Sequence, residues 1–199
     1  RAREMMAQIL PAILRGDRWT LLEIQALDDE VDGLHGHIIG YLGQISEARL
    51  TEQSTQELFD LMEATNDLES IGDLIETNMV NLGLARIEQG LSVSAATAEM
   101  LEELHAAVAE SLDLSMMALA QKNADAARRV GNMKNQINSM ERAAAAHEAS
   151  RLMADAPDRI AHYRFEIDVI ASLKRIYYFT KRIARVSVPY EEKAAMTED

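Results

Sequence analysis

The chain has 199 residues, 48% of them hydrophobic, so it can bury one sizeable core or two small ones and is too apolar for disorder. With three prolines, nine glycines and abundant Ala, Leu, Met and Glu, the composition indicates a helical protein, and the lack of cysteine excludes disulfides and thiolate metal sites. A formal net charge of -13 argues against nucleic acid or an anionic membrane surface as the main partner.

Helical periodicity predicts three helices in the first half of the chain, at residues 1–15, 18–46 and about 54–90. Pro11 should kink the first helix or mark its true start, because proline cannot donate a hydrogen bond inside a helix. Gly16-Asp17 has the pattern of a helix stop followed by a cap, and Thr51 and Ser54 are candidate caps of the third helix.

Two apolar seams with alternating three- and four-residue spacing predict that the long helices pack against their neighbours. They are Ile24, Leu27, Val31, Leu34, Ile38, Tyr41 and Ile45, and Leu58, Leu61, Thr65, Leu68, Gly72, Ile75, Met79 and Leu82. Gly72 on the second seam predicts a close helix crossing. Trp19 is interpreted as a packing anchor. Four glycines off the first seam are expected to admit a neighbouring backbone: Gly33, Gly36, Gly40 and Gly43.

Gly90–Ser94 is the strongest internal break, and three further helices are expected at about 95–121, 123–154 and 158–187. A shift of 106 positions carries the first seam onto Val130, Met133, Ile137, Met140, Ala144, His147 and Arg151, and the turn at Gly16-Asp17 onto Lys122-Asn123. We therefore predict an all-α fold of six helices in two tandem antiparallel three-helix bundles related by internal duplication. The units are assigned to residues 1–91 and 92–189, followed by a frayed tail at 190–199.

Two acidic lines flank the two seams and are the main candidates for chemistry. They are Asp28, Asp32 and His35 on one helix, and Glu69, Asp73 and Glu76 on the next. If the helices pack side by side, these carboxylates converge and need a cation or shifted pKa values, and oxygen ligands suit hard cations such as Mg, Mn, Ca or oxidised iron. The alternative is that the lines are solvated faces of an acidic protein, with His35 at a rim and Glu76 exposed.

The second unit serves as an internal control for this hypothesis. Its corresponding positions are largely cationic or neutral: Lys134, Asn138, Glu141, Lys174, Tyr178 and Lys181. A second metal cluster is therefore not expected. A basic strip, formed by Lys174, Lys181, Arg182 and Arg185, is either an anion or docking site or a solvated face that pairs with the protein's own acids.

The Asp28-x3-Asp32 pair and the run Leu68-Glu69-Ser70-Ile71-Gly72-Asp73 resemble the two acidic helix motifs of the PhoU domain, the phosphate-uptake regulator family. The resemblance covers nearly the whole chain, and residues 66–78 and 173–189 are most similar to the PhoU-like domain of bacterial sodium/phosphate cotransporters. It implies a non-enzymatic domain at the cytoplasmic face of the inner membrane, with no small-molecule substrate. It also implies a metal set at Asp28, Asp32, Glu69 and Asp73, with iron, Mn, Mg or Zn in one cluster at most.

These observations support three hypotheses. In the first, the chain regulates phosphate uptake, either as a domain of a sodium-dependent transporter whose membrane part lies in the same polypeptide, or as a free-standing regulator. The start at Arg1 instead of Met favours a piece of a longer protein, and the seams are long enough to serve a homodimer. The second is a carboxylate-bridged metalloenzyme, which the missing Glu-x-x-His spacing disfavours. The third is a helical scaffold without a ligand.

Overall fold

The structure, a computed structural model, describes residues 1–152 and 158–188, with only the backbone of residues 151 and 152. Within these ranges the chain is helical and contains no strand. The helices are α1 (Ala2–Arg15), α2 (Arg18–Ser46), α3 (Glu52–Asp73), the π-helix η1 (Leu74–Val80), α4 (Asn81–Gln89), α5 (Ala95–Gln121), α6 (Ala124–Asn132), α7 (Lys134–Leu152) and α8 (Arg159–Arg185). α3, η1 and α4 follow one another without a break, and α6 and α7 are separated only at Met133. With each of these runs counted as one long helix, beside α1, α2, α5 and α8, the described part of the chain has the six predicted helices.

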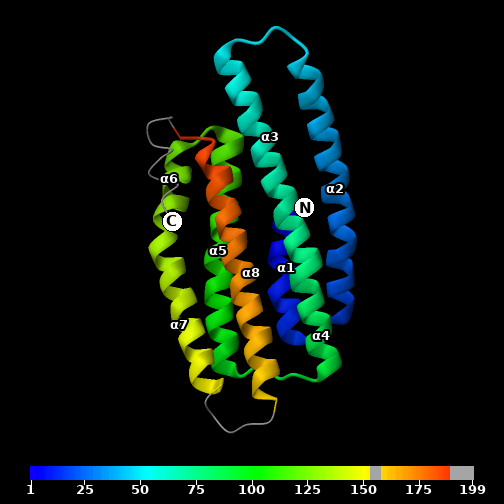
Figure 1. Cartoon of the computed structure of the whole chain (residues 1–199), viewed down its shortest axis with the longest axis vertical. Helices are drawn as coiled ribbons and strands as arrows, with labels where there is room; N and C mark the ends of the chain where they lie inside the picture. Colours follow the sequence, from blue (N-terminus) through cyan, green and yellow to red (C-terminus); the bar gives the residue numbers. More distant parts are fainter. Residues whose placement is uncertain (153–157, 189–199) are drawn as a thin grey trace.

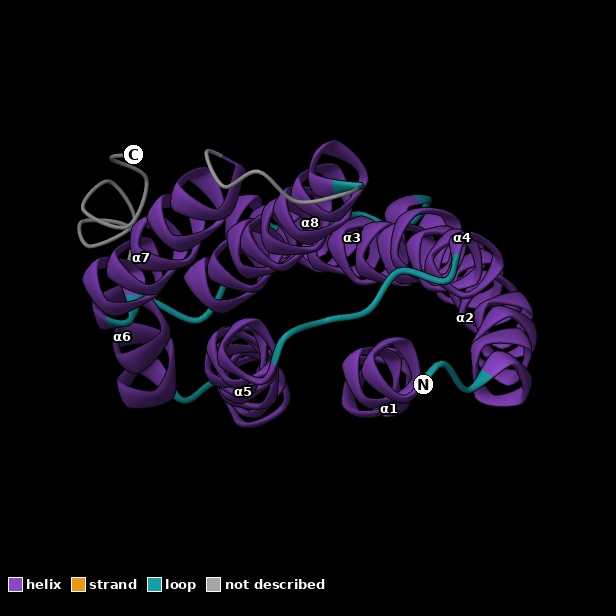
Figure 2. Ribbon diagram, turned by 90° about the horizontal axis from the view of Figure 1, so that it is seen from below, coloured by secondary structure: helices purple, strands orange, loops and turns teal. Residues whose placement is uncertain are grey.

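Four of these long helices form a curved layer, and the other two lie on its concave side. Figure 2 shows α2, α3–α4, α8 and α6–α7 side by side in an arc, with α1 and α5 on its concave side. α1 packs against α2, α5 and η1, whereas α5 packs against α6, α7 and α8. The two halves of the chain meet where α3 packs on α8 and α1 on α5 (Figure 1). Each half therefore contributes one inner helix and two long helices of the curved layer, as the predicted duplication requires.

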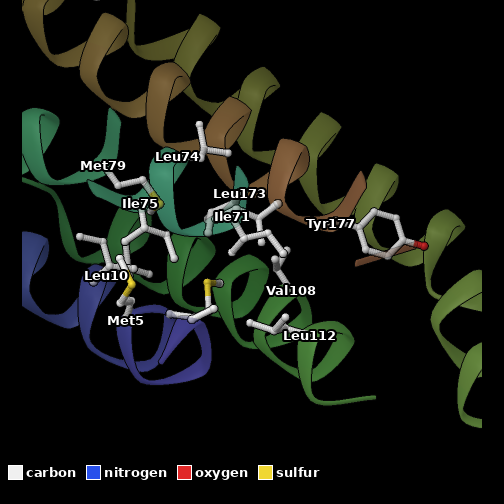
Figure 3. Packing of buried hydrophobic residues seen from close by; sticks show 14 of the residues in the cluster. Met5, Leu10, Ile71, Leu74, Ile75, Met79, Val108, Leu112, Leu173 and Tyr177 are labelled. Atoms are coloured by element: carbon white, nitrogen blue, oxygen red, sulfur yellow. The ribbon is translucent and has the colours of Figure 1, made fainter. Parts of the chain in front are cut away.

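The hydrophobic core is shared by both halves. Figure 3 shows Met5 and Leu10 of α1 and Ile75 and Met79 of η1 in the same cluster as side chains of α5 and α8. Tyr177 of α8 is buried, and its hydroxyl donates a hydrogen bond to the carbonyl oxygen of Val130 at 2.8 Å. Burial raises the pKa of Tyr177, which therefore stays a neutral donor. The division into units at residues 91 and 92 remains a prediction, and the proposed tail at 190–199 lies outside the described residues.

Several predicted helix ends are confirmed by their caps. Gly16 ends α1 in the left-handed conformation at φ 70°, where glycine has no Cβ to clash. The Asp17 carboxylate then accepts a hydrogen bond from the Thr20 N–H at 3.1 Å and caps α2. Asn123 caps α6 in the same way, at 3.0 Å from the Ala126 N–H. The turn at Gly16-Asp17 thus corresponds in structure to the turn at Lys122-Asn123.

Pro11 does not have the predicted role of a helix start. α1 begins at Ala2 and continues through Pro11 to Arg15. Pro11 is therefore accommodated inside the helix, although it lacks the N–H that would donate to the preceding turn.

The packing of α2 differs from the prediction in its outer half. Ile24 and Val31 are buried, but Leu34, Ile38 and Tyr41 are 51%, 43% and 64% exposed. The reason is geometric: α2 has 29 residues and α1 has 14, so α1 covers only the part of the seam near the start of α2. The upper part of the α2–α3 hairpin projects beyond α1 (Figure 1).

Two predictions about single residues of α2 are wrong. A Cβ added at Gly33, Gly36, Gly40 or Gly43 would meet no atom within 4 Å, so these glycines admit no neighbouring backbone. Trp19 is 80% exposed, because Leu21 and Ile24 occupy the buried face of this turn, so it is not a packing anchor.

Candidate functional site

The candidate site lies where α2 crosses α3. Gly72 is buried there, and a Cβ at this position would collide with the Oδ1 atom of Asp28 and lie 3.2 Å from Cγ1 of Val31. The predicted close crossing is thus confirmed, and the missing side chain provides the space for the Asp28 carboxyl group. Asp28 is 6% exposed, and its Oδ1 atom has no hydrogen-bond partner. A buried polar atom without a partner is unusual and requires an explanation.

Three carboxyl groups converge at this crossing. Asp28, Asp32 and Asp73 each have an oxygen atom within 4.8 Å of the others. Asp28 and Asp32 are one helical turn apart on α2, and Asp73 is the last residue of α3. Asp32 and Asp73 are exposed, so the group has one buried and two solvent-facing carboxylates.

The electrostatics of this group oppose ionisation of Asp28. Burial raises the pKa of Asp28 to about 7, with further increases from the nearby charges of Asp32 and Asp73 and smaller ones from Glu76 and Glu69. No cationic side chain contributes to this shift. The arrangement is therefore a carboxylate group that is destabilised in its ionised form, and a cation placed among the three oxygens would remove this penalty.

The other predicted ligands lie near this group but do not belong to it. The ring Nε2 of His35 is 2.9 Å from the amide oxygen of Asn66. Glu76 is half-buried and accepts hydrogen bonds from Gln25 at 2.9 Å and from the hydroxyl of Thr77 at 2.8 Å. Glu69 and His35 instead line a cavity between α1, α2 and α3. The structure thus brings three of the six predicted residues into one possible coordination group.

A π-helix begins directly after this group. Asp73 precedes η1, and Glu76 lies within it. π-helical turns are rare and often occur at functional sites. The sequence predicts an uninterrupted α-helix here, because the apolar spacing gives no signal for the wider turn.

In the second unit, an ion pair occupies the positions that correspond to Glu69 and His35. The Nζ atom of Lys174 lies 2.7 Å from an oxygen of Glu141. Tyr178, at the position that corresponds to Asp73, is exposed, and the guanidinium of Arg182 lies 5.8 Å from its ring centre. The described part of this unit contains no comparable group of acidic and histidine side chains.

The basic strip pairs partly with acids of the same chain. Arg182 and Arg185 of α8 contact the same oxygen of Glu63 on α3, at 3.0 and 3.3 Å. Arg182 also lies 3.2 Å from Asp67, whose pKa is raised to about 6 by burial against the opposing effect of Arg182. Asp67 is not among the predicted site residues. The arginines close together in the sequence of α8 were the feature that could have indicated an acidic partner on a neighbouring helix. These two arginines thus pair with the protein's own acids, as the alternative interpretation predicts, but they are partly buried where the two halves meet.

The fold and the site define a class: a duplicated all-α bundle with an acidic crossing of two helices in its first half. Residues 1–80 match the sequence model of the PhoU domain, and they include every residue of both acidic lines. The match supports, over these residues, the resemblance noted from the sequence.

Solved structures extend the PhoU fold to the rest of the chain. The crystal structure of PhoU from Pseudomonas aeruginosa matches with a TM-score of 0.88 and 18% identity, over 98% of this chain and 91% of that chain. The phosphate transport system regulatory protein PhoU from Streptococcus pneumoniae matches with a TM-score of 0.83 and 17% identity, over 100% of this chain and 91% of that chain. At these identities the likeness is one of fold. No curated protein matches the chain.

Proposed function

We propose that this chain regulates phosphate transport and does not catalyse a reaction. The observation that carries the proposal is the PhoU domain match over residues 1–80, which contain the acidic crossing of α2 and α3. The fold likeness to a phosphate transport system regulatory protein over the whole chain supports it further.

The regulator acts through a cation held by the first unit. Asp28, Asp32 and Asp73 would provide the oxygen ligands. The unpartnered Oδ1 atom of Asp28 supports this role, because a cation would supply the partner that the protein lacks. An all-oxygen group suits Mg, Mn or oxidised iron better than Zn.

Two molecular contexts fit the proposal. In one, the chain is the cytoplasmic domain of a sodium-dependent phosphate transporter, as the resemblance of residues 66–78 and 173–189 implies. In the other, it is a free-standing regulator that works with a separate transporter. No helix that the structure describes is long and apolar enough to cross a membrane. The full-length gene distinguishes the contexts: several apolar stretches of about 20 residues in the same reading frame indicate the transporter domain.

Phosphate uptake by cells tests the function directly. Cells without the gene should take up phosphate at a different rate from cells that carry it, and the Asp28→Ala/Asp73→Ala variant should behave like the deletion. The matched control is Glu99→Ala/Glu103→Ala, which removes two exposed acids one turn apart on α5 and should behave like the parent. Identical uptake with and without the gene would refute the proposed function. A double variant that behaves like the parent would refute the role of the acidic crossing alone.

A further inference from the structure

A polar groove runs between the two halves of the chain, where α8 packs against η1 and α4. Figure 2 shows α8 beside α3 and α4 in the curved layer. A cavity of about 520 Å³ lies between η1, the start of α4 and α8, and a second of about 250 Å³ lies between the end of α4 and the start of α8. Leu82 and Asp168 line both cavities, which therefore adjoin. The larger one alone has a volume typical of small-molecule sites.

The charge of this groove is opposite to that of the whole protein. The chain has 33 acidic and 20 basic side chains, but the groove is lined by three arginines and one carboxylate. They are Arg86, Arg164, Arg175 and Asp168. Arg164 and Arg175 are exposed, and neither forms an ion pair with a described residue. The positive charge of the groove is therefore available to an anion from solution.

Arg86 is fixed at the smaller cavity by contacts within the protein. Its Nη1 atom donates a hydrogen bond to the carbonyl oxygen of Ile13 at 2.8 Å, and its Nε atom is buried without a partner. Burial lowers the pKa of the Arg86 guanidinium, so an anion beside it would stabilise its charged form. A donor that is already held in place loses little side-chain entropy on binding. Arg86 and Arg164 thus form an end of the groove suited to a phosphoryl group, which arginines bind through paired N–H donors.

The larger cavity offers amide groups on an aliphatic wall. Asn78 of η1 and Asn81 of α4 line it and are both exposed. Asn78 forms no side-chain hydrogen bond with a described residue, so its donors and acceptor are all available. The side-chain amide of Asn81 donates to a backbone carbonyl one turn earlier, which leaves its oxygen as an acceptor. Asparagine amides can pair with the edge of a nucleic-acid base, and the aliphatic wall suits the face of its ring.

Asp168 separates these two parts of the groove. Arg164, Asp168, Ala171 and Arg175 are spaced four, three and four residues apart, so they lie on one face of α8. The two arginines are roughly 16 Å apart along the helix axis, farther than one inorganic phosphate can reach. The Asp168 carboxylate would repel an anion at the junction, but it can accept hydrogen bonds from sugar hydroxyls. The groove thus presents amides, a carboxylate and arginines in the order of the base, ribose and phosphates of a nucleotide.

We propose that this groove binds a nucleotide, with its base in the larger cavity, its ribose hydroxyls on Asp168, and its phosphoryl groups at Arg164 and Arg86. An inorganic anion would use only the arginine end and leave the amides and Asp168 without a role. Because the ligand contacts α4 of one half and α8 of the other, it stabilises the native arrangement of the two halves. The proposal depends neither on cation binding at the acidic crossing nor on a role in phosphate transport.

Calorimetric titration of ATP, GTP, CTP and UTP, each in turn, tests the proposal. EDTA and a fixed low ionic strength keep divalent cations off the acidic crossing and hold charge screening constant. At least one nucleotide should bind saturably and raise the melting temperature. Arg164→Glu should weaken this binding by about tenfold or more, because it replaces a phosphate donor by a like charge. Arg128→Glu, which makes the same change of charge at an exposed arginine of α6, is the matched control and should bind like the parent.

Two further measurements test how the ligand is oriented. Asn78→Ala should reduce the discrimination among the four bases without abolishing binding. Removal of the ribose 2′-hydroxyl should weaken binding to the parent but not to Asp168→Ala. Pyrophosphate and the free nucleoside should each bind more weakly than the nucleotide, since each fills only one part of the groove.

Three results would overturn the proposal. One is the absence of saturable binding for all four nucleotides. Another is an equal loss of affinity in Arg164→Glu and Arg128→Glu, which would show a general attraction of charge instead of a site. The third is pyrophosphate binding as tight as that of the best nucleotide, which would assign the groove to an inorganic anion.

Discussion

At the scale of single residues, the site depends on a glycine and a buried aspartate that face each other across the helix crossing. Gly72 leaves space at the crossing of α2 and α3, and Asp28 fills it with a carboxyl group that finds no hydrogen-bond donor for Oδ1. Apolar packing alone does not explain a buried carboxyl group with a raised pKa, because an apolar side chain of similar volume would be more stable there. The residue is more easily explained by a requirement for its charge.

Replacing Asp28 by Asn should remove a pH dependence from the stability of the fold. The pKa of Asp28 rises from 3.8 to about 7 on folding, so the folded state holds this proton more tightly than the unfolded state. The contribution is fully present below about pH 4 and is lost as pH rises through about 7. At pH 8 without divalent cations, Asp28→Asn should therefore be more stable than the parent by roughly 1–3 kcal/mol.

Urea unfolding at pH 4 and pH 8 measures this difference. Asp67, whose pKa is also raised, affects parent and variant equally, so their difference isolates Asp28. An equal loss of stability in both proteins between the two pH values would show that Asp28 ionises freely.

Replacing Gly72 by Ala should disturb the same crossing by steric means. The new Cβ would collide with Asp28 Oδ1 and press on Val31, which should cost about 1–3 kcal/mol of unfolding free energy and displace the oxygen atom proposed to bind the cation. Gly40→Ala is the matched control, because its Cβ would have nothing within 4 Å, and a helical alanine should stabilise by up to about 1 kcal/mol. Thermal unfolding of the two variants should therefore shift in opposite directions; shifts in the same direction would contradict this explanation of Gly72.

At the scale of helices, the ends could be predicted from the sequence, but the length over which neighbouring helices pack could not. Caps depend on a few adjacent residues, and Gly16, Asp17 and Asn123 stand where the sequence indicated them. The periodicity of a seam shows which face is apolar, but not how far a partner helix extends along it. This is why the burial of Leu34 and Ile38 was predicted wrongly although their helix was predicted correctly.

The contact between α3 and α8 depends on an ion-pair network that can be tested by removing Arg182. Asp67 would then stay buried without its nearest cation, at a cost of about 2–3 kcal/mol at pH 8, which is less than for a fully buried pair because Arg182 is partly exposed. The loss should shrink at pH 5, where a carboxyl group with a raised pKa takes up a proton. Lys174→Ala breaks the more exposed pair with Glu141 and should cost less than about 1 kcal/mol.

Urea unfolding of Arg182→Ala and Lys174→Ala at both pH values tests this contact. If the two variants lose the same stability, the network does not hold the halves together. If the loss in Arg182→Ala is the same at pH 5 and pH 8, the unpaired charge of Asp67 is not its cause.

At the scale of the whole molecule, the duplication determines both the fold and its asymmetry. The six helices and their repeat could be predicted from spacing and turns alone, because these are local signals. Which acids meet could be predicted only in part, since Glu69 and His35 lie on the right line but face a cavity, whereas Asp73 meets Asp28. The π-helix after Asp73 sets the path of the chain beyond the site, and such a turn has no clear sequence pattern.

The central claim is that the chain holds a cation in its first unit and not in its second. The most direct measurement is calorimetric titration of Mn²⁺ into chelator-treated, dialysed protein at pH 8. We expect saturable binding by the parent, none by Asp28→Ala/Asp73→Ala, and unchanged binding by Lys134→Ala/Tyr178→Ala, which alters the corresponding positions of the second unit. Equal binding by the parent and by Asp28→Ala/Asp73→Ala, or no saturable binding by the parent to Mn²⁺, Mg²⁺ or iron, would contradict the claim.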